Sequence, residues 1–192
     1  MDRTDELIAV GIFGSPSTAS KSTLLAERAL ALFEREGART HRIALAELDA
    51  ADLLGRARGP ALTDALDAVA RADVVVSSTP VYRETFSGLL KVFFDLLPRD
   101  ALAGRTGLVV ATGALAEHAR VVEDVGRLFR SVGAIAVPGV YGLESEFRDG
   151  RPVAALTARV DRSASAALAR TTRLVEARDT TFEGRPEVGP DR

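Results

Sequence analysis

Strands that alternate with helices along the whole chain predict an α/β fold built on a parallel sheet. Apolar runs of strand length recur, amphipathic segments of helix length follow them, and the sequence shows no internal repeat. Continuous apolar runs are typical of strands that are buried on both faces. Right-handed crossovers between such strands place helices on both faces of the sheet.

Five segments have the composition of strands. Residues 7–13, 73–79 and 106–112 are largely apolar, and the run 134–140 resembles them. Residues 40–45 are more polar, which indicates a strand nearer the edge of the sheet.

Helical spacing of apolar residues predicts a helix after each strand. Ser22 or a neighbouring residue can cap the first helix, Gly37 can end it, and Pro60 suits the first position of the next. The expected helices are 23–35, 60–71, 87–97, 117–132 and 154–177. A connector is expected at 46–59, a loop at 80–86 and a polar hairpin at 143–151.

Five strands in 192 residues predict a flavodoxin-like doubly wound sheet with strand order 2-1-3-4-5 and helices on both faces. The expected organisation is one domain over residues 1–178 and a disordered tail, rich in glycine, proline and charge, over 179–192. Such sheets bind ligands at the carboxyl ends of the strands, where the strand order reverses. The loops after the first, third and fourth strands are therefore the candidate site.

Composition excludes several classes of site. The formal net charge of -2 gives no bulk attraction for nucleic acid or an acidic membrane surface. The chain has no cysteine and only two histidines, which excludes disulfides, thiol nucleophiles and cysteine-bound metals and disfavours a histidine-rich metal site. No signal peptide or membrane-spanning segment is recognised, so we expect a cytoplasmic protein.

The first loop carries the residue types that bind a phosphate. It holds five hydroxyl residues and Lys21 directly before a helix. Backbone N–H groups at a helix start, hydroxyls and one cation suit a terminal phosphate. The spacing matches neither a nucleotide P-loop nor a dinucleotide GxGxxG motif, so a monophosphate such as that of FMN fits better. The alternative is a solvated loop whose serines only cap the helix.

The other two loops can surround a flat ligand. Pro80 and Tyr82 in the second loop offer a restricted backbone and an aromatic ring, with a half-buried structural tyrosine as the alternative. Thr112 and Gly113 in the third present backbone amides that can stabilise charge on a reduced flavin. His118 either hydrogen-bonds a ligand, with a possible catalytic role, or starts a helix in solvent. The sequence shows no acid–base centre, as expected where a cofactor supplies the chemistry.

The chain resembles the NAD(P)H-dependent FMN reductase family, and within it the flavin reductase components of two-component alkanesulfonate monooxygenases. The resemblance covers about residues 8–177. Three blocks carry it: GSPSTASKS at 14–22, TPVYRETFSGLLKVFFDLLP at 79–98 and ATGALAEH at 111–118. The middle block is long and specific, whereas the outer two are weaker but stand in the right order.

The resemblance implies hydride transfer from NADPH or NADH to the N5 atom of FMN, in a homodimer or homotetramer with FMN near the subunit interface. It places the FMN phosphate on Ser15, Ser20, Lys21, Ser22 and Thr23. It places the ribityl chain and ring against Pro80, Val81 and Tyr82, and the pyrimidine end against Thr112 and Gly113. Ser87, Gly88, Lys91 and Asp95 would support the second loop and the subunit contact.

Three departures from the family pattern bear on the cofactor. Ser17 stands where family members often have arginine, and Ala114 where they often have a second glycine. The segment 121–129 lacks an extra tyrosine that some sulfonate-linked members carry, which predicts a regular helix without a bulge. This absence leaves open whether FMN is a transferred substrate or a retained prosthetic group.

The leading functional hypothesis is therefore an FMN reductase that passes reduced FMN to a partner monooxygenase. A second enzyme hypothesis retains FMN and reduces a quinone or azo compound. A flavodoxin-like electron carrier is the alternative from another class, and the net charge of -2 argues against it because such carriers are usually strongly acidic. The sequence does not decide between NADPH and NADH.

Overall fold

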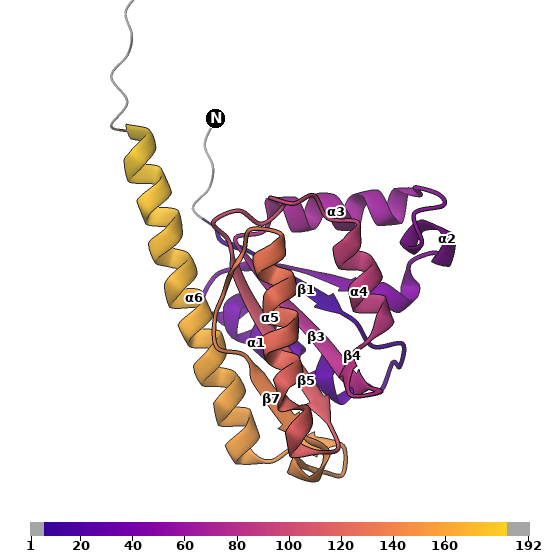
Figure 1. Cartoon of the computed structure of the whole chain (residues 1–192). Coiled ribbons are helices and arrows are strands. Elements are labelled where there is room, and N and C mark those ends of the chain that lie inside the picture. Colours follow the sequence, from indigo (N-terminus) through magenta and orange to yellow (C-terminus); the bar gives the residue numbers. More distant parts are fainter. Residues whose placement is uncertain (1–5, 184–192) are drawn as a thin grey trace, which may run out of the picture.

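A mostly parallel sheet runs through the middle of the protein, with helices on both faces (Figure 1). The computed structural model describes residues 6–183, and the side chains of residues 6–178. The strands in spatial order are β2 (Arg39–Ala44), β1 (Ile8–Phe13), β3 (Val74–Tyr82), β5 (Thr106–Gly113) and then β6 (Ile135–Ala136) with β7 (Val140–Leu143). β5 is the fourth parallel strand, and β6 and β7 together form the fifth. The predicted fold class and strand order are confirmed.

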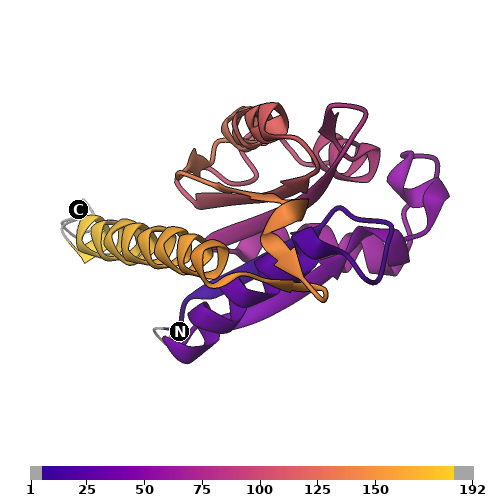
Figure 2. The same ribbon diagram turned by 90° about the horizontal axis from the view of Figure 1, so that it is seen from below.

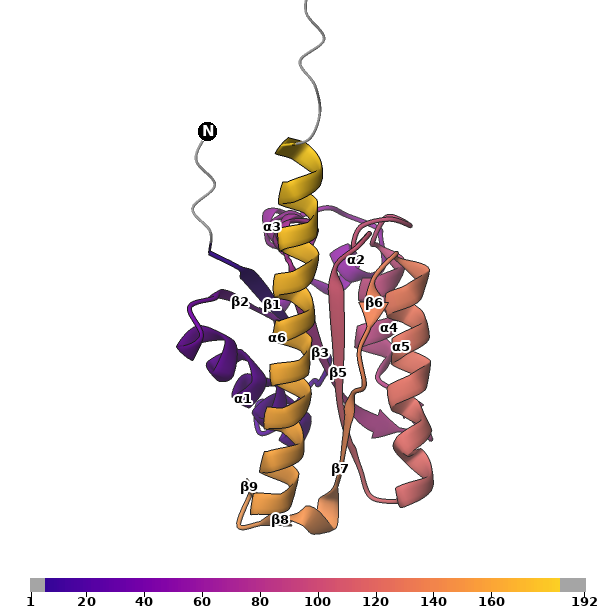
Figure 3. The same ribbon diagram turned by 90° about the vertical axis from the view of Figure 1, so that its left-hand side faces the viewer.

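The helices form one layer on each face of the sheet (Figures 1 and 3). α1 (Lys21–Arg35) and α6 (Ala154–Glu183) contact each other on one face. The other face carries α3 (Pro60–Arg71), α4 (Gly88–Asp95) and α5 (Val121–Ser131). Four short elements complete the helices: η1 (Leu45–Glu47), α2 (Ala50–Leu53), η2 (Ala116–Arg120) and η3 (Glu144–Glu146). None of the helices in the described part of the chain is long and apolar enough to cross a membrane.

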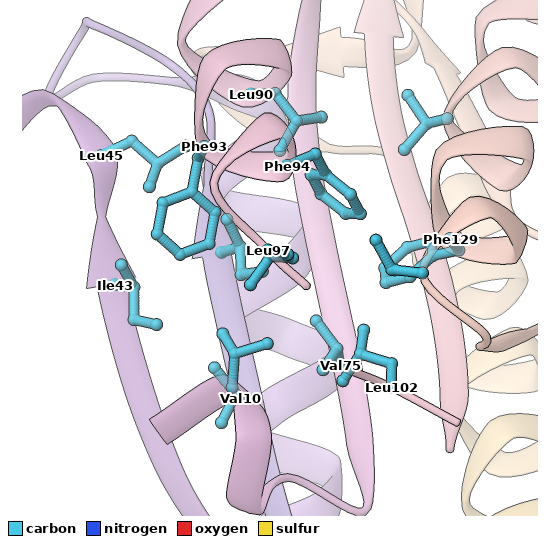
Figure 4. Packing of buried hydrophobic residues seen from close by; sticks show 14 of the residues in the cluster. Val10, Ile43, Leu45, Val75, Leu90, Phe93, Phe94, Leu97, Leu102 and Phe129 are labelled. Atoms are coloured by element: carbon cyan, nitrogen blue, oxygen red, sulfur yellow. The ribbon is translucent and has the colours of Figure 1, made fainter. Parts of the chain in front are cut away.

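Two apolar clusters hold the layers together. One lies between the sheet and α3, α4 and α5, and Figure 4 shows its centre. There the rings of Phe94 and Phe129 meet edge to face with their centroids 5.3 Å apart. Leu90, Phe93 and Phe94 of α4, and Leu97 shortly after it, are all buried and belong to this core. The other cluster lies between the sheet and α1 with α6.

Several element bounds differ from the sequence prediction. The connector at 46–59 contains α2, and the single helix predicted at 117–132 is η2 followed by a regular α5 without a bulge. The fifth strand is interrupted at Pro138 and Gly139. Proline cannot donate to the ladder, and a Cβ on Gly139 would lie 2.6 Å from the Val109 carbonyl oxygen. α6 continues to Glu183, so the tail predicted from 179 begins too early; residues 184–192 lie outside the described residues.

The segment 80–86, predicted as a loop, is a β-hairpin. β3 continues to Tyr82 and pairs antiparallel with β4 (Thr85–Phe86). The two residues of the turn, Arg83 and Glu84, have φ angles of 48° and 69°. A two-residue hairpin turn of type I′ requires positive φ at both positions, which glycine and asparagine adopt far more readily than arginine or glutamate. Sequence reasoning therefore missed this hairpin because its turn lacks the usual residues.

The double variant Arg83→Asn, Glu84→Gly is expected to raise the free energy of unfolding by about 1 kcal/mol. The new residues adopt positive φ with less strain, although the exposed Glu84–Arg120 ion pair is lost. Urea unfolding measures the difference. The turn of the second hairpin, between β8 (Phe147–Arg148) and β9 (Arg151–Pro152), is the internal control because it already has Asp149 and Gly150 at positive φ. The single variant Asp149→Asn should change stability little, and equal effects of the two variants would contradict the strain argument.

Candidate functional site

Sheet register brings the three predicted loops to one edge. The Gly14 N–H donates to the Ser78 carbonyl oxygen at 2.9 Å, which fixes the first loop beside the end of β3. Pro80 of β3 pairs with Thr112 of β5, which places the second loop beside the third. The chain crosses from one side of β1 to the other at this point, where doubly wound sheets bind their ligands.

A hollow of about 240 Å³ lies where the loops meet. Eight of its lining residues are predicted site residues: Ser15, Ser20, Lys21, Pro80, Val81, Tyr82, Thr112 and Gly113. Ser17, Ala19 and Glu144 complete the lining. Residues far apart in the sequence, and predicted to bind different parts of one ligand, thus face the same space.

The first loop folds on its own hydroxyl groups. Ser15 Oγ accepts from the Ser17 N–H at 3.1 Å, and Ser20 Oγ accepts from the Thr23 N–H at 3.3 Å as the N-cap of α1. The first N–H groups of a helix have no acceptor within it, and α1 has no acidic residue in its first turn. The N-terminus of α1 therefore presents donors and partial positive charge to the hollow.

Two of the predicted phosphate residues lie elsewhere. Ser22 is fully buried, with its Oγ 3.0 Å from Ser20 Oγ, so it supports the cap and does not line the hollow. Thr23 lines a neighbouring hollow that shares Ala19, Ser20 and Lys21 with the first. Consecutive residues of a helix point in different directions, so residues that are adjacent in the sequence here do not share one hollow.

The third loop is shaped by a close contact between Gly113 and Tyr141. A Cβ on Gly113 would lie 2.4 Å from Tyr141 Oη and 3.1 Å from Val81 Cβ, so only glycine fits here. Tyr141 Oη donates to the Leu115 carbonyl oxygen at 2.7 Å, which holds the loop against β7. Burial, and to a smaller degree the nearby Glu144 and Glu117, raise the pKa of Tyr141. Its hydroxyl therefore stays protonated at neutral pH and donates this hydrogen bond.

Thr79 holds together the two ends of the hairpin in the second loop. Thr79 Oγ1 accepts from the Ser87 N–H and donates to the Pro80 carbonyl oxygen, both at 2.9 Å. Ser87 in turn caps α4 by accepting from the Leu90 N–H at 3.2 Å. Tyr82 stands at the rim with 47 % of its surface exposed, so its ring is free to cover a ligand.

Sequence reasoning missed Tyr141 and Glu144. Tyr141 lies in β7 and Glu144 directly follows that strand, and only the sheet places β7 beside β5 and the loop after it. His118 lies in η2 and does not line the hollow. Its Nδ1 is buried and has no hydrogen-bond partner among the residues that the structure describes.

An ion pair anchors the segment that carries Glu144. Glu146 accepts two hydrogen bonds from Arg159 of α6, at 2.7 and 2.9 Å, and one from the Leu143 N–H at 2.9 Å. The Arg159 hydrogen bonds lower the pKa of Glu146, with a further contribution from the Leu143 N–H. The second Arg159 nitrogen also donates to the Tyr141 carbonyl oxygen at 2.8 Å, which joins α6 to β7.

The variant Glu146→Gln is expected to lower the free energy of unfolding at neutral pH by about 1 kcal/mol, a value reduced for the partial exposure of the pair. A carboxyl whose pKa is lowered on folding stabilises the protein above its unfolded pKa of about 4.3, and the stabilisation disappears as the pH falls through the folded pKa. The wild-type and variant proteins should therefore converge in stability as the pH falls below the folded pKa of Glu146, as urea unfolding at several pH values measures. Glu144→Gln, which breaks no ion pair within residues 6–178, is the matched control. A difference that persists unchanged at low pH would contradict this role.

The residues of the hollow fit a phosphorylated aromatic ligand. Hydroxyls, one ammonium group and a helix N-terminus gather at one end, and an aromatic ring with a glycine backbone at the other. The described residues contain no group of three histidine, cysteine or acidic side chains able to hold a metal ion.

Comparison with protein families and with individual relatives gives one consistent result. A family described as NADPH-dependent FMN reductase matches residues 9–149. The chain is 37 % identical over 169 residues to the NADH-dependent FMN reductase SfnE of Pseudomonas putida, covering 84 % of this chain and 91 % of that protein. It is 38 % identical over 118 residues to an FMN reductase (NADPH) of Pseudomonas putida, where the match spans only 60 % of the relative's length.

Solved structures agree with this result. An NADH:FMN oxidoreductase, EMOB in its apo form, superposes with a TM-score of 0.78 at 30 % identity, covering 86 % of this chain and 89 % of that one. An archaeal flavodoxin superposes with a TM-score of 0.64 at 10 % identity, which supports the fold alone.

Proposed function

Because the chain belongs to the NADPH-dependent FMN reductase family, we propose that it transfers hydride from a reduced nicotinamide nucleotide to FMN. One observation carries the proposal beyond family membership. The hollow at the carboxyl edge of the sheet joins a hydroxyl-rich helix start to an aromatic hairpin and the glycine that ends β5. These are the two ends of a site for a flavin monophosphate.

Residues of the first loop hold the phosphate in this proposal. Ser15 and Ser20 supply hydroxyls, Lys21 supplies the ammonium group, and α1 supplies its first N–H groups. Ser22 and Thr23 act indirectly, since one packs beneath the N-cap and the other faces the neighbouring hollow.

The second and third loops orient the ring. Val81 and Tyr82 supply apolar surface, and the Gly113 backbone approaches closely because no side chain intervenes. Bound FMN supplies the hydride acceptor. The chain would contribute position and a partly water-excluded surface, and the backbone of Thr112 and Gly113 would stabilise negative charge at the pyrimidine end of the ring.

The size of the hollow supports a second subunit at this site. Pockets that enclose a small ligand usually measure about 300–1,000 Å³. A hollow of about 240 Å³ holds only part of FMN. In our proposal a second copy of the chain therefore covers the part of the flavin ring that this subunit leaves exposed. Delivery of reduced FMN to a partner monooxygenase rests on the resemblance to sulfonate-linked reductases and is also a proposal.

Flavin titration and nucleotide oxidation test the function. The purified protein should bind FMN and oxidise NADPH, NADH or both, with a rate that saturates in added free FMN. Because relatives are named for each nucleotide, both are compared at equal concentration. Oxidation of neither nucleotide with any flavin would overturn the proposal. FMN that stays bound through gel filtration, together with quinone turnover, would instead support a reductase that retains its flavin.

A further inference from the structure

The ammonium group of Lys21 lies over an aromatic ring from the separate hairpin that follows β7. Its Nζ is 5.4 Å from the ring centroid of Phe147, within the range of a cation–π interaction. Lys21 is the first residue of α1, whereas Phe147 begins β8, in the excursion between β7 and α6. Figure 2 shows the orange excursion beside the indigo segment that leads into α1, and Gly150 of the excursion lines a hollow with Ala19 and Ser20.

The Phe147 ring is held in place by its burial and by the contacts of its hairpin. It is 8 % exposed and belongs to the apolar cluster between the sheet and α1 with α6. Its backbone pairs with Pro152 of β9, and the preceding residue, Glu146, is tied to Arg159 of α6. The Val153 N–H also donates to the Glu146 carbonyl oxygen at 2.8 Å, which closes the base of the hairpin.

A ring holds an ammonium group without neutralising it. The other lysine of the chain, Lys91, is paired with Asp95 at 2.6 Å, so its charge is already balanced. Lys21 has no ion pair or side-chain hydrogen bond with any residue that the structure describes, and the nearby Glu27 is engaged by Arg42 at 2.9 Å. All three N–H donors of Lys21 therefore stay available to an anion. Lys21 lines the hollow where the three loops meet and also the neighbouring hollow beside Gly150.

We propose that Phe147 is a positioning residue that holds the Lys21 ammonium group toward the 5′-phosphate of FMN. The proposal rests on the proposed function and assigns the β8–β9 hairpin a role in cofactor recognition. Phe147 touches no part of the ligand in this arrangement and acts through Lys21. It therefore favours flavins that carry the phosphate over riboflavin, which lacks it.

The test compares the affinities for FMN and riboflavin in Phe147 variants. Phe147→Leu removes the aromatic face, and we expect its FMN dissociation constant to rise about five-fold, a typical size for one partly exposed cation–π contact. Its riboflavin dissociation constant should change less than about two-fold. Phe147→Tyr keeps an aromatic face and should bind FMN about as tightly as the wild-type protein. Because leucine leaves a small cavity, Phe147→Met provides a second non-aromatic variant of larger volume.

A double-variant cycle separates positioning from general damage. If Phe147 acts through Lys21, Phe147→Leu should weaken FMN binding little further once Lys21→Ala is present. Equal loss of FMN and riboflavin affinity in the leucine and methionine variants would overturn the inference, as would full additivity with Lys21→Ala. Failure of the wild-type protein to bind FMN would overturn the proposed function itself, which is a different result.

Discussion

Replacing Asp73 with alanine is expected to lower the free energy of unfolding by about 3 kcal/mol, the largest stability effect that we predict. The carboxylate is 1 % exposed and accepts from Arg105 at 2.8 Å, from Arg178 at 2.9 Å and from the Ile8 N–H at 3.0 Å. Alanine leaves two guanidinium groups and one backbone N–H without this acceptor. The value is at the low end for a broken buried ion pair because the two arginines, 20 % and 37 % exposed, can be rehydrated.

Urea unfolding of Asp73→Ala measures this loss, with Asp95→Ala as the control. Asp95 forms an exposed pair with Lys91, and its removal should cost at most about 0.5 kcal/mol. Because Asp73 lies before the amino end of β3 and the hollow at the other end, FMN affinity of the folded variant should be unchanged. Hydrogen exchange should also show weaker protection of the end of α6 near Arg178. A loss as small as that of Asp95→Ala would show that the ion pairs of Asp73 with Arg105 and Arg178 contribute little to stability.

Replacing Lys21 with alanine is expected to raise the FMN dissociation constant about ten-fold or more. A hydrogen bond to a charged group contributes about 1.5–3 kcal/mol, and each 1.4 kcal/mol is a factor of ten in affinity. Lys21 is the one lysine or arginine that lines the hollow, and the family's usual arginine is replaced here by Ser17. Riboflavin affinity should change little, since riboflavin has no phosphate.

Fluorescence titration of both flavins checks this expectation at two salt concentrations. Wild-type FMN affinity should fall with added salt, and the Lys21→Ala protein should respond less. Lys91→Ala removes the other lysine, which is paired with Asp95, and should leave the ratio of the FMN and riboflavin affinities unchanged. Unchanged FMN affinity in Lys21→Ala would mean that the hydroxyls and amides of the loop hold the phosphate without the cation.

The layered fold followed from local pattern. Strands buried on both faces are apolar along their whole length, and β1, β3 and β5 show this directly in the sequence. Capping and breaking signals were equally local, since Pro60 begins α3 and Gly133, with a φ of 85°, follows α5. The hairpin at Arg83 and Glu84 escaped prediction because tertiary contacts hold a turn that these residues disfavour.

The candidate site was likewise predictable from the sequence only in part. Ser15, Ser20, Lys21, Pro80, Val81, Tyr82, Thr112 and Gly113 were predicted from loop position and family resemblance, and they do line one hollow. Loop position placed them at one edge because the order of a doubly wound sheet decides which strand ends meet, and their binding of FMN stays a prediction.

The sequence by itself determined the sheet, its order and the edge at which the loops gather, because these depend on periodicity and chain direction. Only the tertiary structure decided what surrounds those loops. Tyr141, Glu144 and Phe147 reach the first and third loops because the fifth strand pairs with β5 and the following hairpin packs beside α1. Contacts between residues so far apart leave no periodic or local signal in the chain, so packing alone brings an aromatic ring beneath Lys21.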